Sequence, residues 1–194
     1  ASTVPQLALH NRGRATVLEL GGEEIVGGKQ NRIVNASFLI GAGMKVDLPV
    51  SCVEHGRWHP ASPRFAPGEA AFFSLRRAKL EQVSRSLQAC DAPISDQGAV
   101  WEEIEERQAQ ASARSATDAM HDLFRQREDP LAAYERAFPC PQGTVGLIVA
   151  LSGRMAGADL FDRPRTAAQP WAKLVRSYAF DALDGEPGAP VAHS

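Results

Sequence analysis

The sequence predicts an α+β domain with a mostly antiparallel sheet and helices packed on it. Segments rich in β-branched and aromatic residues, which are typical of strands, occupy the first and last thirds of the 194 residues. Segments with apolar residues at helical spacing occupy the middle and the C-terminal end. We therefore expect the N- and C-terminal strands to share one sheet. A single domain is predicted over residues 1–183, followed by a Gly- and Pro-rich tail over 184–194.

The first third predicts three strands that end at or near glycines. They are "RATVLEL" (14–20), "RIVNASFLI" (32–40) and the long extended run "MKVDLPVSCVEHGRW" (44–58). Pro49 lacks a backbone N–H and so predicts an edge position or a bulge in the third strand. A Pro-rich loop over 60–67 and a short strand over 70–75 are expected to follow.

Four helices are predicted next, over 75–88, 95–113, 115–127 and 129–138. Ser95 or Asp96 is a suitable N-cap for the second helix, and Asp129 before proline marks the start of the fourth. In the last third, "TVGLIVAL" predicts a strand, Ser152-Gly153 a turn and "RMAGADLF" an antiparallel return. "QPWAKLVRSYAFDAL" (169–183) predicts a closing amphipathic helix.

The composition excludes several classes of protein. A net charge of −2 provides no long-range field for nucleic acid or anionic lipid, so no nucleic-acid or membrane partner is expected. No apolar run reaches 18 residues. Three irregularly spaced cysteines argue against a disulfide framework and favour a reducing, cytoplasmic location. A homo-oligomer is compatible with the sequence.

The stretch "PVSCVEHGRWHP" (49–60) concentrates residues that carry chemistry. In an extended strand Cys52, Glu54 and Trp58 share one face, while His55 and Arg57 share the other. This alternation separates Cys52 from the histidines and argues against a zinc site, so no metal or cofactor is expected. A carboxylate beside Cys52 would raise the pKa of the thiol, so a buried core cysteine is the simpler interpretation.

Glu54 and Arg57 leave two interpretations open. A carboxylate inside a strand needs a cationic partner if it is buried. That partner is Arg57 if Gly56 bends the strand, or otherwise an arginine from elsewhere, with Arg32 the first choice. The pair is then either a structural ion pair or a group that holds a ligand hydroxyl, cation or water.

The segment "GGKQNRIV" (27–34) places Gln30, Asn31 and Arg32 after two glycines. Such a loop can present backbone N–H groups and a guanidinium to a phosphate. It lacks the spacing of known nucleotide-binding loops, and from the residues alone a solvated hairpin turn is favoured.

Several segments, in order, resemble a known family. They are "KQNRIVNASFLI", "LPVSCVEHGRW", "DQGAVWEEIEE", "VGLIVALSGRMAGADLFD" and "LVRSYAFDAL". The family is that of the ADP-ribosylglycohydrolase and rhodanese-phosphatase associated protein domains, and the resemblance covers about residues 15–184. It implies a connection with ADP-ribose or NAD-derived metabolites but assigns no reaction. It marks as motif positions Gln30, Asn31, Arg32, Cys52, Glu54, Arg57, Trp58, Gln97, Trp101 and Asp159.

Together these observations predict a domain that binds, and if it is an enzyme processes, an anionic nucleotide-like small molecule. The expected ligand-binding residues are Gln30, Asn31, Arg32, Glu54, Arg57 and Asp159. Catalytic residues are unassigned, except that Glu54 is a candidate general base if there is chemistry. The alternative is an interaction or structural module in which these polar residues form a buried network that determines the fold. A concave pocket lined by them would favour the first function, and a filled, mutually hydrogen-bonded cluster the second.

Overall fold

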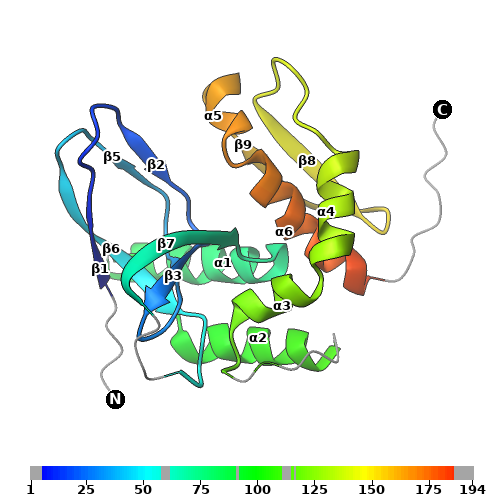
Figure 1. Ribbon diagram of the computed structural model, residues 1–194, viewed down its shortest axis with the longest axis horizontal. Coiled ribbons are helices and arrows are strands. Elements are labelled where there is room, and N and C mark those ends of the chain that lie inside the picture. The colour runs from blue at the N-terminus through cyan, green and yellow to red at the C-terminus, as the bar shows by residue number, and fades with distance from the viewer. Residues whose placement is uncertain (1–5, 58–61, 91, 111–114, 116, 186–194) are drawn as a thin grey trace. The chain divides into compact units, whose positions relative to one another are not determined.

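The computed structural model describes residues 6–57, 62–90, 92–110, 115 and 117–185 (Figure 1). The fold class is α+β, as predicted. The chain divides into two compact units, residues 1–126 and 127–194, which are described in turn. The single domain expected over 1–183 stays a prediction.

The first unit is built on an antiparallel sheet of five strands. The strand order is β1-β6-β4-β3-β7, and the bounds are β1 Gln6–His10, β3 Glu23–Gly28, β4 Arg32–Val34, β6 Lys45–Cys52 and β7 Ser62–Ala70. Two short strands, β2 Val17–Glu19 and β5 Phe38–Ile40, pair separately. Three helices complete the unit: α1 Phe73–Cys90, α2 Gln97–Gln110 and α3 Met120–Gln126.

The core of this unit forms where apolar residues of the strands and helices meet. Ile33 on β4 and Leu48 on β6 are fully buried, and Leu75 on α1 and Ile104 on α2 are 1% exposed. Leu75 and Ile104 lie on the buried faces of the helices predicted over 75–88 and 95–113. The hairpin between β3 and β4 uses Gly27 and Gly28, whose positive φ values of 134° and 57° favour glycine.

The second unit contains a β-hairpin and three helices. The hairpin joins β8 Gly146–Leu151 to β9 Arg154–Leu160, and the helices are α4 Glu128–Ala137, α5 Pro164–Ala168 and α6 Trp171–Asp184. Ion pairs join α4 to α6. One runs from Arg176 to Glu128 at 2.7 Å, and another from Arg127, just before α4, to Asp184 at 2.5 Å. Glu128 has a pKa below its ordinary value, because Arg176 donates hydrogen bonds to its carboxylate.

Several predicted elements are confirmed, and others need correction. The strand expected within 144–151, the turn at Ser152-Gly153 and its antiparallel return are present. These strands pair with each other, however, and not with the N-terminal sheet as expected. α6 includes Asp184, the first residue of the expected tail, and 186–194 lie outside the described residues.

Three corrections concern the first unit. The predicted strand 32–40 is two strands in different sheets, because the chain bends at residues 35–36. The part of the predicted Pro-rich loop that the structure describes lies in β7, and the short strand expected over 70–75 is replaced by the end of β7 and the start of α1. Pro49 lies on the inner strand β6, where it pairs with the first residue of β1.

Candidate functional site

The chain bends just after the end of β6, and this bend brings Glu54 and Arg57 together. The strand stops at Cys52, and Glu54 forms an isolated bridge with Ala119, just before α3. The N–H of Gly56 donates to the carbonyl of Thr117 at 2.8 Å. A Cβ on Gly56 would lie 2.9 Å from the Cα of Thr117, so this close approach requires glycine. The bend at Gly56 therefore makes Arg57 the partner of Glu54.

Three residues in the described part of the chain donate hydrogen bonds to Glu54. Arg57 donates from Nε to Oε1 at 2.8 Å and from Nη2 to Oε2 at 2.6 Å. The backbone N–H of Asn31 donates to Oε2 at 3.0 Å, and the hydroxyl of Thr117 to Oε1 at 2.8 Å. Burial raises the pKa of Glu54, but the hydrogen bonds from Arg57, Asn31 and Thr117 together hold the pKa below its ordinary value. Glu54 is therefore a paired, ionised carboxylate.

The guanidinium of Arg57 is directed at protein acceptors. Besides its two bonds to Glu54, it donates from Nη1 to the carbonyl of Gly28 at 2.7 Å and from Nη2 to Oδ1 of Asn31 at 3.1 Å. The same Oδ1 accepts from the N–H of Gly27 at 3.1 Å. These bonds tie the end of β6 to the β3–β4 hairpin.

The network continues to the surface through Glu24 and His121. The amide of Asn31 donates to Oε1 of Glu24 at 3.4 Å, and Nδ1 of His121 lies 3.0 Å from Oε2 of Glu24. The side chain of Glu24 is fully buried, whereas that of His121 is 34% exposed. The hydrogen bond with Glu24 raises the pKa of His121, in spite of its partial burial. We call the set Glu24, Asn31, Glu54, Arg57, Thr117 and His121 the polar network.

The other predicted site residues lie elsewhere. The guanidinium of Arg32 contacts the sulfur of Cys52, its partner across the β4–β6 ladder, and burial lowers the pKa of Arg32. Gln30 is buried in the hairpin turn, and its side-chain nitrogen has no hydrogen-bond partner among the described residues. Asp159 lies on β9 in the second unit and accepts a hydrogen bond from the hydroxyl of Tyr178 at 2.8 Å.

Three remaining motif positions have structural contacts or lie outside the described residues. The side-chain amide of Gln97 clamps the backbone of Cys52, accepting from its N–H at 2.7 Å and donating to its carbonyl at 2.8 Å. This clamp fastens α2 to β6. The ring of Trp101 stacks on that of His55, with centroids 4.3 Å apart. Trp58 lies outside the described residues.

Sequence reasoning missed three members of the polar network: Glu24, Thr117 and His121. Glu24 could have been found from the sequence, because it is a carboxylate next to the apolar pair Ile25-Val26 on a strand. Thr117 and His121 carried none, because they join the network from segments 63 and 97 residues away from their partners. The three cysteines are free thiols, with Cys52 buried.

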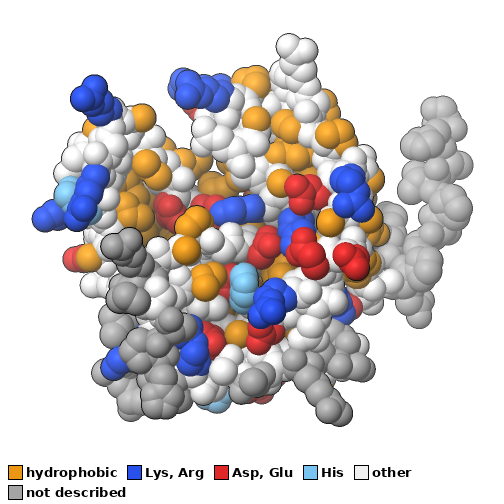
Figure 2. Space-filling model, in the orientation of Figure 1, with side chains coloured by type: hydrophobic (Ala, Val, Ile, Leu, Met, Phe, Trp, Pro, Cys, Tyr) orange, Lys and Arg blue, Asp and Glu red, His pale blue; other side chains and the backbone are white. Residues whose placement is uncertain are grey.

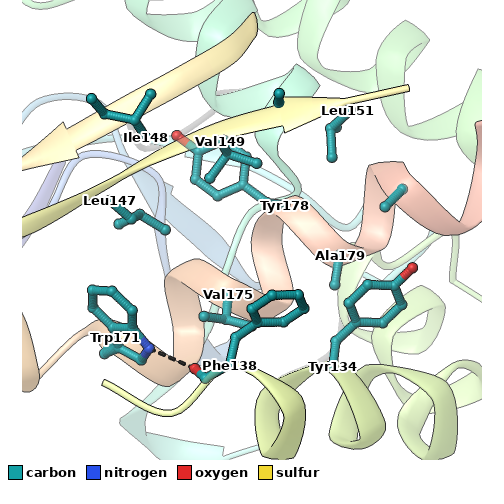
Figure 3. A pocket seen from close by; sticks show the side chains of 12 residues that line it. Tyr134, Phe138, Leu147, Ile148, Val149, Leu151, Trp171, Val175, Tyr178 and Ala179 are labelled. Atoms are coloured by element: carbon teal, nitrogen blue, oxygen red, sulfur yellow. Dashed lines mark hydrogen bonds between the residues drawn. The ribbon is translucent and has the colours of Figure 1, made fainter. Parts of the chain in front are cut away.

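The second unit has an apolar pocket of about 310 Å³ between β8, α4 and α6 (Figure 3). Leu147, Val149 and Leu151 line it from β8. Phe138, Trp171 and Val175 lie towards the same space from the helical side, and Nε1 of Trp171 donates to the carbonyl of Phe138 at 2.8 Å. A pocket of this size and lining suits an apolar group.

Two negative findings apply to the described residues alone. No three His, Cys, Asp or Glu side chains in that part of the chain come together as a possible set of metal ligands. None of the described helices combines the length and the apolar character needed to cross a membrane.

Comparison with protein families decides the identity. The family model of the ARG and Rhodanese-Phosphatase-superfamily-associated Protein domain matches residues 1–193. The chain belongs to this family. No curated protein and no solved structure matches it. Membership in the ARG and Rhodanese-Phosphatase-superfamily-associated Protein domain family confirms the resemblance seen in the sequence, and it assigns no ligand or reaction.

Proposed function

We propose that this chain is an interaction module. In this proposal the polar network fixes the fold of the first unit, and the apolar surface of the second unit binds an apolar segment of a partner protein. The observation that carries the proposal is the pairing of Arg57, whose Nε, Nη1 and Nη2 all donate to protein oxygens. A guanidinium used in this way has little capacity left for a phosphate or carboxylate ligand.

The network also meets the criterion for a structural role. It is a filled cluster whose charged members hydrogen-bond to one another, and Glu24 and Glu54 are 1% and 4% exposed. Two pockets in the described part of the chain are lined by other residues. Buried polar groups that are fully satisfied in this way make a fold specific, because any rearrangement leaves them unpaired.

The hairpin of the second unit supplies the proposed docking surface. Residues of β8 line the apolar pocket, and Ile148 among them is 68% exposed. On β9, Met155 and Leu160 are 70% and 71% exposed. Figure 2 shows hydrophobic side chains gathered over β8 and β9. A two-stranded hairpin with apolar residues on both faces is marginally stable in water, which favours a second surface packed against it.

Binding of an apolar fluorescent dye to the folded protein tests this proposal. Ile148 lines the pocket and is exposed, so Ile148→Glu should reduce dye binding several-fold. Val145→Glu is the matched control, since Val145 is 44% exposed and does not line the pocket. Equal dye binding by the wild type and both variants would contradict a docking surface at this pocket.

A second candidate function is binding of an anionic nucleotide-like molecule such as ADP-ribose. One observation favours it: within the part of the chain that the structure describes, the buried side-chain nitrogen of Gln30 lacks a partner, and a ligand oxygen would satisfy it. Calorimetric titration with ADP-ribose tests this function. Heat of binding that disappears in Gln30→Leu would support it, whereas the interaction module predicts no heat in either protein.

A further inference from the structure

Two buried cations of the first unit have no carboxylate partner in the described part of the chain. Lys79, on α1, is 2% exposed, and its Nζ donates to Oδ1 of Asn35 at 2.5 Å and to Oγ of Ser51 at 3.4 Å. Arg32, on β4, is 7% exposed, and its polar contact among the described residues is the sulfur of Cys52. Lys79 therefore has oxygen acceptors, whereas Arg32 has none within the described residues.

The guanidinium of Arg32 is a charged group that still needs an anion. An unpaired charge in the interior is costly, because it loses water and gains no opposite charge in exchange. Arginine stays protonated in proteins, so Arg32 cannot avoid this cost by losing its proton. Its five N–H donors form a planar fork that fits a carboxylate, whereas a thiol is a weak acceptor. A carboxylate from outside the chain would complete the site.

The register of the sheet determines the face on which Arg32 lies. Residues directly opposite each other on antiparallel strands share a face. Arg32 is opposite Ile25 on β3 and opposite Cys52 on β6. Along β6, Cys52 shares its face with Leu48, four positions earlier, whereas Ser51 points to the other face, towards α1. Arg32 therefore lies on the face of the sheet that carries Ile25 and Leu48.

An apolar pocket of about 410 Å³ lies on this face. Ile25 and Leu48 line it from the inner strands β3 and β6. Residues of the two outermost strands, β1 and β7, also line it, so the sheet curls around the pocket. They include Leu7, Leu9 and Phe65. The volume falls within the range of small-molecule sites, and the lining suits an aliphatic chain.

Arg32 lies beside the pocket, because its partner in the ladder, Ile25, is one of the lining residues. The Cα atoms of such a pair are about 5 Å apart. His10 and Glu19 are the described lining residues that can carry charge. A carboxylate at Glu19 repels an anion, so the anionic end of a ligand is directed away from Glu19 and towards Arg32.

We propose that this pocket binds a straight-chain aliphatic carboxylate, whose chain fills the apolar space and whose carboxylate pairs with the guanidinium of Arg32. This class of ligand meets both observations, an apolar lining and a buried cation without an anion. The site goes beyond the interaction module and does not rest on it, because it lies in the first unit and the docking surface lies in the second.

Equilibrium dialysis of the full chain tests the ligand class with octanoate, 1-octanol and acetate. Octanol has the chain without the charge, and acetate has the charge without the chain. Octanoate should bind about 10- to 100-fold more tightly than octanol, the scale for a hydrogen bond to a charged group, and acetate should show no binding. Hexanoate should bind more weakly than octanoate, because each buried methylene group adds up to about fourfold in affinity.

Arg32→Met tests the residue, because it removes the guanidinium but keeps an aliphatic side chain. Octanoate should then bind no more tightly than octanol, while the affinity for octanol stays that of the wild type. Arg85→Met is the matched control, since Arg85 is exposed on α1. It should bind both probes as the wild type does.

A second variant keeps the test decisive if Arg32→Met does not fold. Ala66 lines the pocket and is exposed, so Ala66→Trp fills the space without overpacking the core. It should weaken octanoate and octanol alike by at least about tenfold, roughly the loss for two buried methylene groups. The proposal is overturned if folded wild-type protein does not bind octanoate, binds octanoate and octanol equally, or binds octanoate as tightly as a folded Ala66→Trp variant does.

Discussion

Arg57 donates two parallel hydrogen bonds to the carboxylate of Glu54, from Nε to Oε1 at 2.8 Å and from Nη2 to Oε2 at 2.6 Å. Both side chains are largely buried, at 17% and 5% exposed. Bidentate pairs of this kind are among the stronger polar contacts in proteins, but they remain costly to bury unless every other oxygen and N–H is satisfied. Here Asn31, Thr117 and Gly28 supply those bonds.

Glu54→Gln should destabilise the protein by roughly 1–3 kcal/mol, the scale for losing a charged hydrogen-bond partner. The amide keeps the shape of the carboxylate but cannot accept both bonds from Arg57. Urea unfolding midpoints of wild type and variant measure the loss. Glu81→Gln is a suitable control, because the salt bridge of Glu81 with Arg77 is exposed. An unchanged midpoint for Glu54→Gln would mean that the network does not stabilise the fold.

Gly56→Ala should cost about 1–3 kcal/mol, as overpacking typically does. The new methyl group would lie 2.9 Å from the Cα of Thr117, so the backbone before α3 would have to move. Gly185→Ala is the control, since the nearest atom to its Cβ is 3.4 Å away. Comparison of the two thermal midpoints checks the claim, and equal midpoints would show that the bend is loosely packed.

His121 should titrate above its ordinary pKa of 6.5, because Glu24 accepts a hydrogen bond from it. A raised pKa means that this pair stabilises the folded state fully below pH 6.5 and that the contribution is lost as pH rises through the folded-state pKa. The ring-proton shifts of His121 in NMR spectra give the pKa directly. Glu24→Gln should bring it back towards 6.5, and an unshifted pKa in the wild type would contradict the pairing.

Lys79 should make the stability of the protein depend on pH in the direction opposite to that of His121. Its pKa falls from 10.5 to about 7 on folding, so between these values the unfolded chain binds a proton that the folded chain lacks. The free energy of unfolding therefore rises with pH across this window. The contribution of Lys79 is fully present above pH 10.5 and is lost progressively as pH falls from 10.5 to about 7. The stability of the wild type relative to Lys79→Met should increase by a few kcal/mol across the window. A difference that stays constant with pH would show that Lys79 keeps its proton when buried.

Local patterns predicted five of the helices and the C-terminal hairpin, because periodicity and turn residues act over a few positions, but they missed α5, which has only five residues. Of the two kinds of partner left open for Glu54, the structure has Arg57, because Gly56 permits the bend, and Arg32 contacts Cys52 instead. The division of residues 32–40 between two sheets depends on which strands lie alongside, and that information is not local. Lys79 was missed for the same reason, because its burial depends on β6 and on the loop before α2.

The most direct test of the central claim is the thermal unfolding midpoint of the wild type over a concentration series of ADP-ribose, with Arg57→Lys alongside. A polar network that only fixes the fold predicts no shift with ADP-ribose, and a lower midpoint for Arg57→Lys, because lysine cannot reproduce the paired bonds to Glu54. A ligand site predicts a wild-type midpoint that climbs with the logarithm of ADP-ribose concentration. Such a climb, abolished in a folded Arg57→Lys variant, would contradict the claim.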